Sequence, residues 1–337
     1  MKGNSVMKPN RIAILNTNRI ISVLPKHLDI LRRTAPDCEF LLAEKAEDLP
    51  VLAADADALI LWPSVGPDLI SYIRNTPGLR WLHLFTSGVD RLINSEAGKI
   101  PGYRITSTKG IHGYPISDHV LALMYAFLRQ LHAAAHYQQK RSWSSDILSG
   151  NCREIAGLTV GIIGVGNIGL ELARKCKLLD MTVLGAKRQP ITSQWLDKCY
   201  PISQLPDLLA ASDFVVLCLP LTEESRHLIG REELRVMKNS AILINIARGG
   251  VVDQEALIEA LEQGIIAGAG LDVTDPEPLP ESNPLWGMPN VIITPHISAQ
   301  SPQYMDRAIH VIAENLRRFL ADEPLLDEVP RHGLESR

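Results

Sequence analysis

The stretch GLTVGIIGVGNIGLELARKCKLL, residues 157 to 179, decides the fold of this chain of 337 residues. An apolar run is followed by glycines in a G-x-G-x-x-G pattern, at Gly164, Gly166 and Gly169, and then by apolar residues at helical spacing. Such glycines permit a tight turn and bring the backbone close to a pyrophosphate, while the helix N-terminus, at Asn167 and Ile168, offers unpaired N–H groups. The stretch therefore predicts a strand, a phosphate-binding turn and a helix. A glycine-rich turn that binds nothing is the alternative.

Short apolar runs rich in β-formers alternate with helical patterns on both sides of this stretch, which is typical of parallel sheets covered by helices. Six strand candidates, the number expected of a complete dinucleotide-binding fold, span 158–166, 181–186, 213–220, 241–247, 267–273 and 290–296. An earlier series spans 11–15, 39–43, 58–62, 79–85 and 103–108. Pro115 opens a helical pattern that runs to about Gln139. Ser301 and Pro302 read as the N-cap and first residue of a helix to about Leu320.

The predicted fold class is α/β, with two doubly wound parallel-sheet domains. We expect a Rossmann dinucleotide-binding domain at 113–296, inserted in a smaller flavodoxin-like substrate domain formed by 1–112 and 297–337. The last helix is placed on the first domain because the few residues that follow it cannot form a domain of their own. Ligands of such sheets gather outside the carboxyl ends of the strands.

Composition narrows the classes of partner. The chain has 34 basic and 38 acidic residues, a net charge of -4, and no long basic run, so nucleic acid and anionic membrane are not expected as partners. The five cysteines lie far apart without a C-x-x-C pair, which disfavours a disulfide framework or a metal site and fits a reducing cytoplasm. The longest uncharged helical stretch, 119–128, is too short to span a bilayer.

The end of the second Rossmann strand bears on the choice of cofactor. An acid is usual there, because a carboxylate binds the ribose 2′-hydroxyl of NAD. This sequence instead has Lys187 and Arg188, whose charges would attract the 2′-phosphate of NADP. We therefore expect NADP to be preferred, with NAD possible; a solvated basic turn is the alternative.

Three strand ends of the same domain carry unusual polar residues. Arg248 follows one apolar strand, Asp272 and Glu277 surround the end of the next, and His296 follows the last. Reduction of a keto group needs a proton for the oxygen and positive charge beside it, which His⁺ and Arg can supply. A carboxylate beside the imidazole favours its protonated form and fixes its tautomer. Each residue taken singly has a structural alternative: an ion pair for Arg248, a solvated loop for Glu277, and a helix cap or backbone hydrogen bond for His296.

Taken with their spacing, these residues resemble the D-isomer-specific 2-hydroxyacid dehydrogenase family over nearly the whole chain. The resemblance rests on SGVD (87–90), SDHVLALMYAFLRQL (117–131), GLTVGIIGVGNIG (157–169), LPLTEESRHLI (219–229), INIARGGVVDQEAL (244–257), LDVTDPEPLP (271–280) and NPLWGMPNVIITPHIS (283–298). It implies that Arg248 binds substrate, that Glu277 supports His296 as the acid or base, and that Asp272 lies near the nicotinamide.

The resemblance implies further contacts. The backbone at Ser87, Gly88 and Val89 would hold the substrate carboxylate. Cofactor contacts would extend to Leu219, Pro220, Ile246, Ala247 and His296. A homodimer, formed through the long helix and the region of Trp143, is also implied.

Departures from the family pattern narrow the activity. Lys187 replaces the usual acid, which resembles NADPH-using glyoxylate and hydroxypyruvate reductases. Glu277 disfavours the formate dehydrogenases, which resemble this pattern but carry Gln there. The expected function is reduction of a small 2-ketoacid such as glyoxylate or hydroxypyruvate to the D-2-hydroxyacid. The competing hypothesis is a dinucleotide sensor that binds partner proteins, like the corepressors of this fold, without significant turnover.

Overall fold

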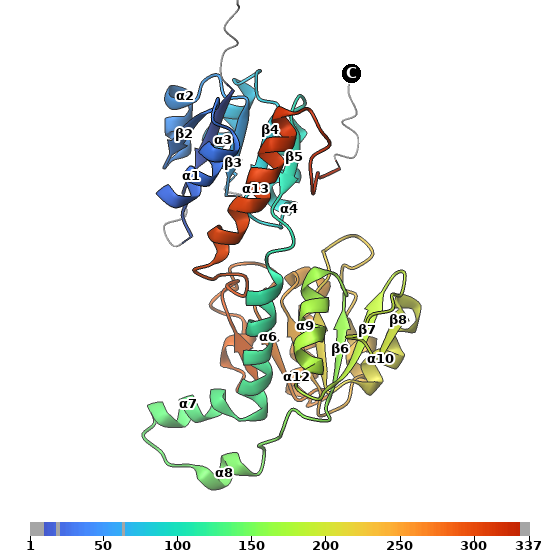
Figure 1. Cartoon of the computed structure of the whole chain (residues 1–337). Helices are drawn as coiled ribbons and strands as arrows, with labels where there is room; N and C mark the ends of the chain where they lie inside the picture. The colour runs from blue at the N-terminus through green and yellow to red at the C-terminus, as the bar shows by residue number, and fades with distance from the viewer. Residues whose placement is uncertain (1–9, 18–20, 63–64, 331–337) are drawn as a thin grey trace, which may run out of the picture. The chain divides into compact units, whose positions relative to one another are not determined.

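Two sets of short apolar strands build two separate sheets, each with all of its strands parallel (Figure 1). The computed structural model describes residues 10–17, 21–62 and 65–330. The chain divides into a first unit, residues 1–111 and 301–337, and a second unit, residues 112–300. The first unit is therefore assembled from both ends of the chain, and the sequence of the second unit is inserted between these two segments.

The sheet of the first unit has the strand order β2-β1-β3-β4-β5, the flavodoxin-like arrangement. Its strands are β1 (Arg11–Leu15), β2 (Glu39–Ala43), β3 (Ala58–Leu61), β4 (Trp81–Leu84) and β5 (Arg104–Ser107). Its helices are α1 (Pro25–Thr34), α2 (Leu49–Leu52), α3 (Pro67–Arg74), α4 (Asp90–Ile93), α5 (Glu96–Lys99) and α13 (Tyr304–Leu320), with a short 3-10 helix at Ala46–Asp48.

Successive side chains along each strand point to opposite faces of the sheet, and this divides the core of the unit into two layers. Ile12, Ile14 and Ile60 point to one face, which α1 and α13 cover side by side (Figure 1). Leu15 and Leu59 point to the opposite face and pack with residues of α3. Because strand side chains alternate with a period of two, one apolar run supplies both layers.

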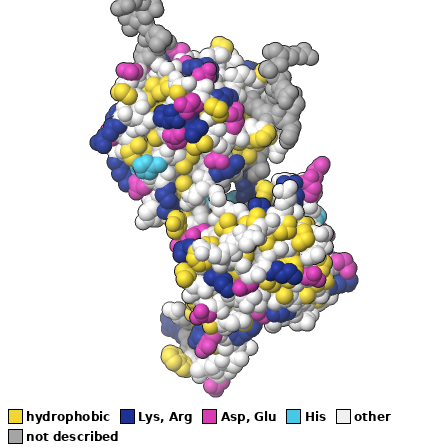
Figure 2. Space-filling view, turned by 45° about the vertical axis from the view of Figure 1, so that its right-hand side comes forward, with side chains coloured by type: hydrophobic (Ala, Val, Ile, Leu, Met, Phe, Trp, Pro, Cys, Tyr) yellow, Lys and Arg dark blue, Asp and Glu magenta, His cyan; other side chains and the backbone are white. Residues whose placement is uncertain are grey.

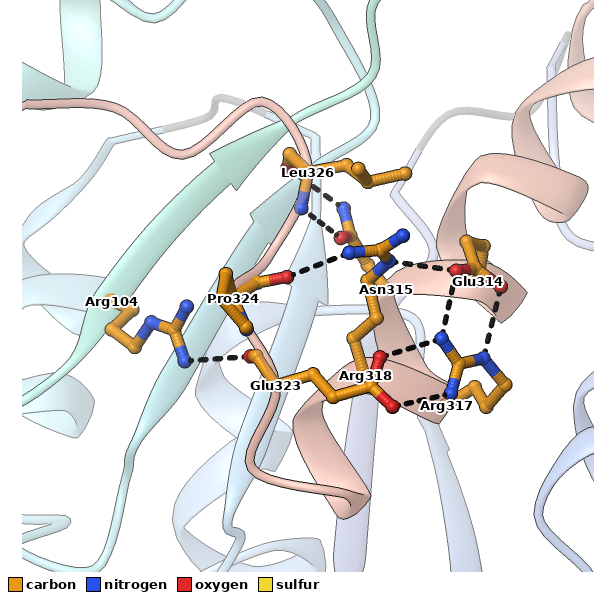
Figure 3. A network of polar contacts seen from close by, with 8 residues as sticks. All are labelled: Arg104, Glu314, Asn315, Arg317, Arg318, Glu323, Pro324 and Leu326. Atoms are coloured by element: carbon orange, nitrogen blue, oxygen red, sulfur yellow. Dashed lines mark hydrogen bonds and ion pairs between the residues drawn. The ribbon is translucent and has the colours of Figure 1, made fainter.

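The segment after α13 closes the β5 edge of this sheet. The Val329 N–H donates to the Ile105 carbonyl at 2.8 Å, and Glu328 forms an antiparallel bridge with Thr106. Arg104 also binds the Glu328 carboxylate through Nη2 at 2.8 Å. Figure 3 shows the polar network that holds this segment against the end of α13; its members are Arg104, Glu314, Asn315, Arg317, Arg318, Glu323, Pro324 and Leu326. An edge so covered cannot pair with another chain.

The sheet of the second unit has the strand order β12-β11-β10-β9-β6-β7-β8. Its strands are β6 (Thr159–Ile163), β7 (Thr182–Lys187), β8 (Lys198–Pro201), β9 (Phe214–Leu217), β10 (Ile242–Asn245), β11 (Gly268–Leu271) and β12 (Val291–Ile293). Its helices are α6 (Gly113–Leu128), α7 (Leu131–Gln139), α8 (Ser145–Ser149), α9 (Asn167–Lys177), α10 (Leu205–Ala211), α11 (Arg231–Val236) and α12 (Gln254–Glu262), with 3-10 turns at Ile202–Gln204, Gly249–Val251 and Pro284–Gly287. The direction of winding reverses between β6 and β9, as in a Rossmann fold.

The two faces of this second sheet carry separate apolar clusters. Side chains of α6 and α9, such as Val120 and Leu172, pack on one face, and these two helices lie side by side (Figure 1). Side chains of α10, α11 and α12, such as Leu208 and Leu257, pack on the other. The expected fold class, two parallel α/β domains, is confirmed.

Three local expectations were wrong. The sequence predicts six strands in the second unit, but β8 adds a seventh: this edge strand pairs only with β7, so it needs no apolar run. The helix expected to reach Gln139 breaks after α6, because Gln130 adopts a left-handed conformation with φ of 54° and its side chain caps the Phe127 carbonyl at 2.8 Å. Ser301 does not cap α13, which begins three residues later, and its hydroxyl accepts instead from Arg307 at 2.9 Å.

The charges on the surface, the helices, the cysteines and the clusters of ionisable side chains can be compared with what the composition predicts. Figure 2 shows basic and acidic side chains interspersed over the visible face. No helix among the described residues is both long and apolar enough to cross a membrane. Within the same part of the chain, all five cysteines are free thiols, and no three His, Cys, Asp or Glu side chains gather as metal ligands would.

Candidate active site

The turn between β6 and α9 has the shape of a phosphate cradle. Gly164 has a φ of 100°, and a Cβ there would lie 2.5 Å from the Cys218 carbonyl oxygen. A Cβ on Gly169 would lie 2.4 Å from the Gly164 oxygen. Gly166 instead faces open space, with nothing within 4 Å of a built Cβ. The first and third glycines are thus required by close packing, while the second leaves the backbone open to a ligand.

The start of α9 completes the cradle. The N-cap is Gly166, and no side chain caps the first turn. Asn167 is exposed and Ile168 is half-buried. Unpaired N–H groups and the positive end of the helix dipole therefore face outward, which suits a pyrophosphate. The residues fit a bound dinucleotide.

The other expected cofactor contacts lie at the same end of the sheet. Leu219, half-buried, and Pro220, exposed, follow β9, which is the neighbour of β6 across the point where the winding reverses. Ile246 and Ala247 are buried directly after β10. Carboxyl ends of these adjacent strands form the usual ligand crevice of a doubly wound sheet.

Two cations stand at the end of β7. Lys187 is the last residue of the strand and Arg188 follows it; both are exposed. Within the described part of the chain, neither side chain has a hydrogen bond or a salt bridge, although Glu224 is near enough to feel Arg188. The pKa of Glu224 is lowered, mainly by the hydrogen bond from Thr222, with a smaller contribution from Arg188. These two side chains remain available to bind an anion.

The turn that carries Arg248 is held by a buried amide. Asn245 Nδ2 donates to the Arg248 carbonyl at 2.9 Å, and Asn245 Oδ1 accepts from the Ala247 N–H at 3.0 Å. Arg248 is half-buried, and its Nη1 donates to the Ala247 carbonyl at 2.7 Å. A Cβ on Gly249 would lie 2.0 Å from the Thr274 carbonyl carbon, so this turn packs on the segment that leads to Glu277.

Asp272 is the buried anion of the site. Its Oδ1 accepts from the Thr294 hydroxyl at 2.6 Å and from the Ile297 N–H at 2.9 Å, and its Oδ2 accepts from the Ser298 N–H at 3.0 Å. Burial acts to raise the pKa of Asp272, but the hydrogen bonds from Ser298, Thr294 and Ile297 outweigh burial, and the net pKa is lowered. Asp272 is therefore a carboxylate that ties down the segment around His296.

His296 and Glu277 are in direct contact. Nδ1 of His296 lies 3.1 Å from each of the two Glu277 carboxylate oxygens. The histidine side chain is 46% exposed and the glutamate side chain 30%, so the pair is open to a ligand while remaining hydrogen-bonded. A carboxylate can only accept, so Nδ1 carries a hydrogen and Nε2 is the nitrogen that faces chemistry.

The backbone of His296 has an uncommon conformation. Its φ is 53°, in the left-handed region, and its N–H donates to the carbonyls of Asp272 at 2.9 Å and Thr294 at 3.0 Å. A non-glycine residue in this region costs roughly 1 kcal/mol or more and persists where surrounding bonds hold it.

The loop expected to bind the substrate carboxylate lies in the first unit, between β4 and α4. Ser87 is exposed, and Gly88 and Val89 are half-buried. The Thr86 hydroxyl donates to the Gly88 carbonyl at 2.8 Å and shapes the loop. Among the described residues, no acceptor binds the N–H groups of Ser87, Gly88 or Val89. Such a row of unpaired donors suits an anion.

Sequence reasoning missed three residues that shape the site. Asn245 could have been found, because it is polar inside an otherwise apolar strand. Thr294 stands two residues before His296 and has the hydroxyl that binds Asp272. His119 lies on α6, and its Nε2 is 3.0 Å from the Thr294 hydroxyl oxygen. No sequence signal distinguishes His119 from an ordinary helix-surface histidine.

Comparison with known proteins identifies the family of the chain. Residues 121–298 match the family model described as D-isomer specific 2-hydroxyacid dehydrogenase, NAD binding domain. A glyoxylate reductase of Korarchaeum cryptofilum is 35% identical over 314 residues, covering 90% of each chain.

Solved structures give the same result. A D-isomer specific 2-hydroxyacid dehydrogenase family protein of Aeromonas salmonicida has a TM-score of 0.84 and 30% identity, covering 96% of this chain and 99% of that one. An NADPH-dependent glyoxylate/hydroxypyruvate reductase of Sinorhizobium meliloti, in complex with NADP and sulfate, has a TM-score of 0.78 and 26% identity, covering 96% and 98%. The chain therefore belongs to the D-isomer specific 2-hydroxyacid dehydrogenase family, and it is an enzyme that uses a nicotinamide dinucleotide.

Proposed function

We propose that this enzyme reduces small 2-ketoacids, such as glyoxylate and hydroxypyruvate, to D-2-hydroxyacids, with NADPH as the preferred reductant. The observation that carries the proposal is the bond between His296 Nδ1 and both Glu277 oxygens, each at 3.1 Å, because it leaves Nε2 free to give a proton to a ligand when the ring is protonated on both nitrogens, and to take one back when it is not. The names of the two relatives above support the substrate class.

The roles of the side chains follow from their chemistry. A bound reduced nicotinamide supplies the hydride. His296 donates the proton to the keto oxygen from Nε2, and Glu277 holds the imidazole in the tautomer and orientation that this step needs. Arg248 places positive charge beside the oxygen as it becomes negative, and Asn245 fixes the turn that presents that charge. The reverse oxidation uses the same nitrogen of His296 as base.

The substrate carboxylate is assigned to the first-unit loop. The N–H groups of Ser87, Gly88 and Val89 lack acceptors among the described residues and can bind two carboxylate oxygens. These donors are backbone groups, so the loop recognises the part common to all 2-ketoacids.

The cofactor preference is assigned to Lys187 and Arg188. Two exposed cations at the end of β7 suit the 2′-phosphate that distinguishes NADP from NAD. The Sinorhizobium meliloti reductase was crystallised with NADP, which agrees with this assignment.

A homodimer is also proposed. Leu131 on α7 is 55% exposed and Trp143, which follows α7, is 95% exposed, so this region presents apolar surface that a second copy can cover. Sedimentation velocity should give the mass of two chains, and Trp143→Glu should give one; a monomer in both would end this part of the proposal.

The function is tested by following NADPH absorbance with a panel of 2-ketoacids. Glyoxylate and hydroxypyruvate should be reduced, with the hydroxypyruvate product having the D configuration. A folded protein that binds NADPH but turns over no ketoacid would instead support the dinucleotide sensor, the competing function for this fold.

A further inference from the structure

His119 lies in a chain of hydrogen bonds that begins on α6 and ends at the segment carrying His296. Its side chain is 17% exposed, and its Nε2 lies 3.0 Å from the Thr294 hydroxyl oxygen and 3.8 Å from Asp272 Oδ1. The Thr294 hydroxyl lies 2.6 Å from that same Oδ1. Three side chains from α6, the end of β11 and the end of β12 thus form one connected path.

The direction of each bond in this path can be assigned. The pKa of Asp272 is lowered: burial would raise it, but the hydrogen bonds that the carboxylate accepts prevail, so the group is ionised and can only accept. The single hydrogen of the Thr294 hydroxyl therefore points at Asp272. Thr294 must then accept from His119, which carries a hydrogen on Nε2. The path is directional, because each hydrogen in it points from His119 toward Asp272.

The far end of the path sets the backbone of His296. The Asp272 carboxylate accepts from the N–H groups of Ile297 at 2.9 Å and Ser298 at 3.0 Å, and its main-chain carbonyl accepts from the N–H of His296 at 2.9 Å. The backbone of His296 is left-handed, with φ of 53°. Such a conformation persists only where hydrogen bonds to the residue and to its neighbours in the chain hold it. A rotation of Asp272 would therefore move the imidazole relative to Glu277.

The near end of the path is fixed to the phosphate cradle. α6 packs against α9, the helix whose N-terminus forms the cradle. The approach is close at Gly113, where a Cβ would lie 3.2 Å from the Cβ of Glu171. α6 is thus positioned by the element that binds the cofactor, and His119 connects that position to the segment of His296.

We propose that His119 is a positioning residue: through Thr294 and Asp272 it holds His296 in register with the cofactor cradle. This inference rests on the proposed function, because it assigns His119 a purpose in the proton transfer of His296. His119 itself touches neither the imidazole of His296 nor its Glu277 partner in any bond of the path.

The test compares variants that break the path with variants that preserve it. His119→Leu and Thr294→Val remove one hydrogen-bonding group each while keeping similar volume. His119→Gln retains an N–H donor, and Thr294→Ser retains the hydroxyl. His310→Gln, at an exposed histidine on α13, is the matched control. For each variant we would measure kcat and KM with glyoxylate, the dissociation constant of NADPH by fluorescence, and the Tm.

His119→Leu and Thr294→Val should each lower kcat by roughly 10- to 100-fold, the scale of a misplacement by about 1 Å, with NADPH affinity nearly unchanged. His119→Gln, Thr294→Ser and the control should retain most of kcat. The double variant His119→Leu/Thr294→Val should be no slower than the worse single variant, because both changes break one path. The proposal would be overturned by an unchanged kcat in His119→Leu, or by losses of kcat that multiply in the double variant. It would also be overturned if His119→Leu and His119→Gln lowered kcat equally.

A second readout does not depend on turnover. Long-range 1H–15N spectra of the His296 ring in the cofactor-free protein should show a protonated Nδ1 in wild type and in His119→Gln, and a changed or broadened signal in His119→Leu. If wild type reduces no ketoacid, the proposed function fails, while this spectrum still decides the positioning role. An identical His296 signal in all three proteins would refute that role alone.

Discussion

His83, buried in the middle of β4, should make the stability of the protein fall with acidification by an amount that can be worked out. Its Nε2 lies 3.0 Å from the Thr108 hydroxyl oxygen, and that hydroxyl donates to the Leu84 carbonyl at 3.0 Å. Nε2 must then be the donor. A neutral ring with its hydrogen on Nε2 has none on Nδ1, so Nδ1 accepts from the Thr106 hydroxyl at 2.7 Å, and that oxygen accepts in turn from the Trp81 indole N–H at 2.8 Å. The ring is neutral, and both nitrogens are satisfied.

Burial lowers the pKa of His83 from 6.5 to about 3. Above pH 6.5 the ring is neutral in the folded and unfolded chains, and it has no effect on the pH dependence. Between pH 6.5 and about 3 the unfolded chain binds a proton that the folded chain does not, so stability falls as pH falls. At about 1.4 kcal/mol per pH unit, the loss reaches about 3 kcal/mol at pH 4.5 and about 4 kcal/mol at pH 3, where the folded chain begins to bind the proton too.

The assay is urea unfolding of wild type and His83→Gln at pH 7.5 and pH 4.5. Glutamine keeps a donor for Thr108 but has no proton to bind, so wild type should lose about 3 kcal/mol more than the variant over this interval. The exposed-histidine variant His310→Gln should behave as wild type. Equal losses in wild type and His83→Gln would refute the reasoning. Should His83→Gln fail to fold, an NMR titration of wild type decides: a His83 ring that titrates above pH 4.5 contradicts a buried neutral histidine.

The remaining predictions concern the site. His296→Gln should lower kcat by roughly 100-fold or more with NADPH affinity intact, as measured by steady-state kinetics and fluorescence titration; unchanged turnover would remove His296 from the mechanism. Glu277→Gln should lower kcat by roughly 10-fold or more with NADPH affinity intact, because the His296 ring loses the carboxylate that orients it through Nδ1, and an unchanged kcat would contradict this role. Replacing Lys187 and Arg188 together with serine should raise KM for NADPH far more than KM for NADH, and equal increases would defeat the phosphate assignment.

The sequence predicts the parts of this enzyme that depend on local patterns. Gly164 and Gly169 are required because neighbouring backbone atoms leave no room for a Cβ at either position. Their spacing therefore predicts the strand, the turn and the helix around them. His296 and Glu277 follow strands that are neighbours in any Rossmann sheet, and their contact could therefore be anticipated.

Features that depend on tertiary context could not be read from the sequence. β8 is an edge strand with a lysine and a proline, and its pairing to β7 is set by the sheet rather than by its own residues. The break at Gln130 lies inside an unbroken helical period, since Leu128 and Leu131 keep the spacing of one face. The bond from His119 to Thr294 joins residues 175 positions apart, and no local pattern marks either of them.

The assembly of the first unit from both ends of the chain constrains how the protein is made. The apolar layer over Ile12 and Ile60 is completed by α13, whose residues leave the ribosome after the whole second unit. We expect the contiguous second unit to fold during synthesis. During that time part of one apolar face of the first sheet stays exposed, because α13 has not yet been made. The early strands should therefore depend on chaperones until α13 has been synthesised. In a chain truncated before Tyr304, this apolar face of the first sheet would stay exposed permanently.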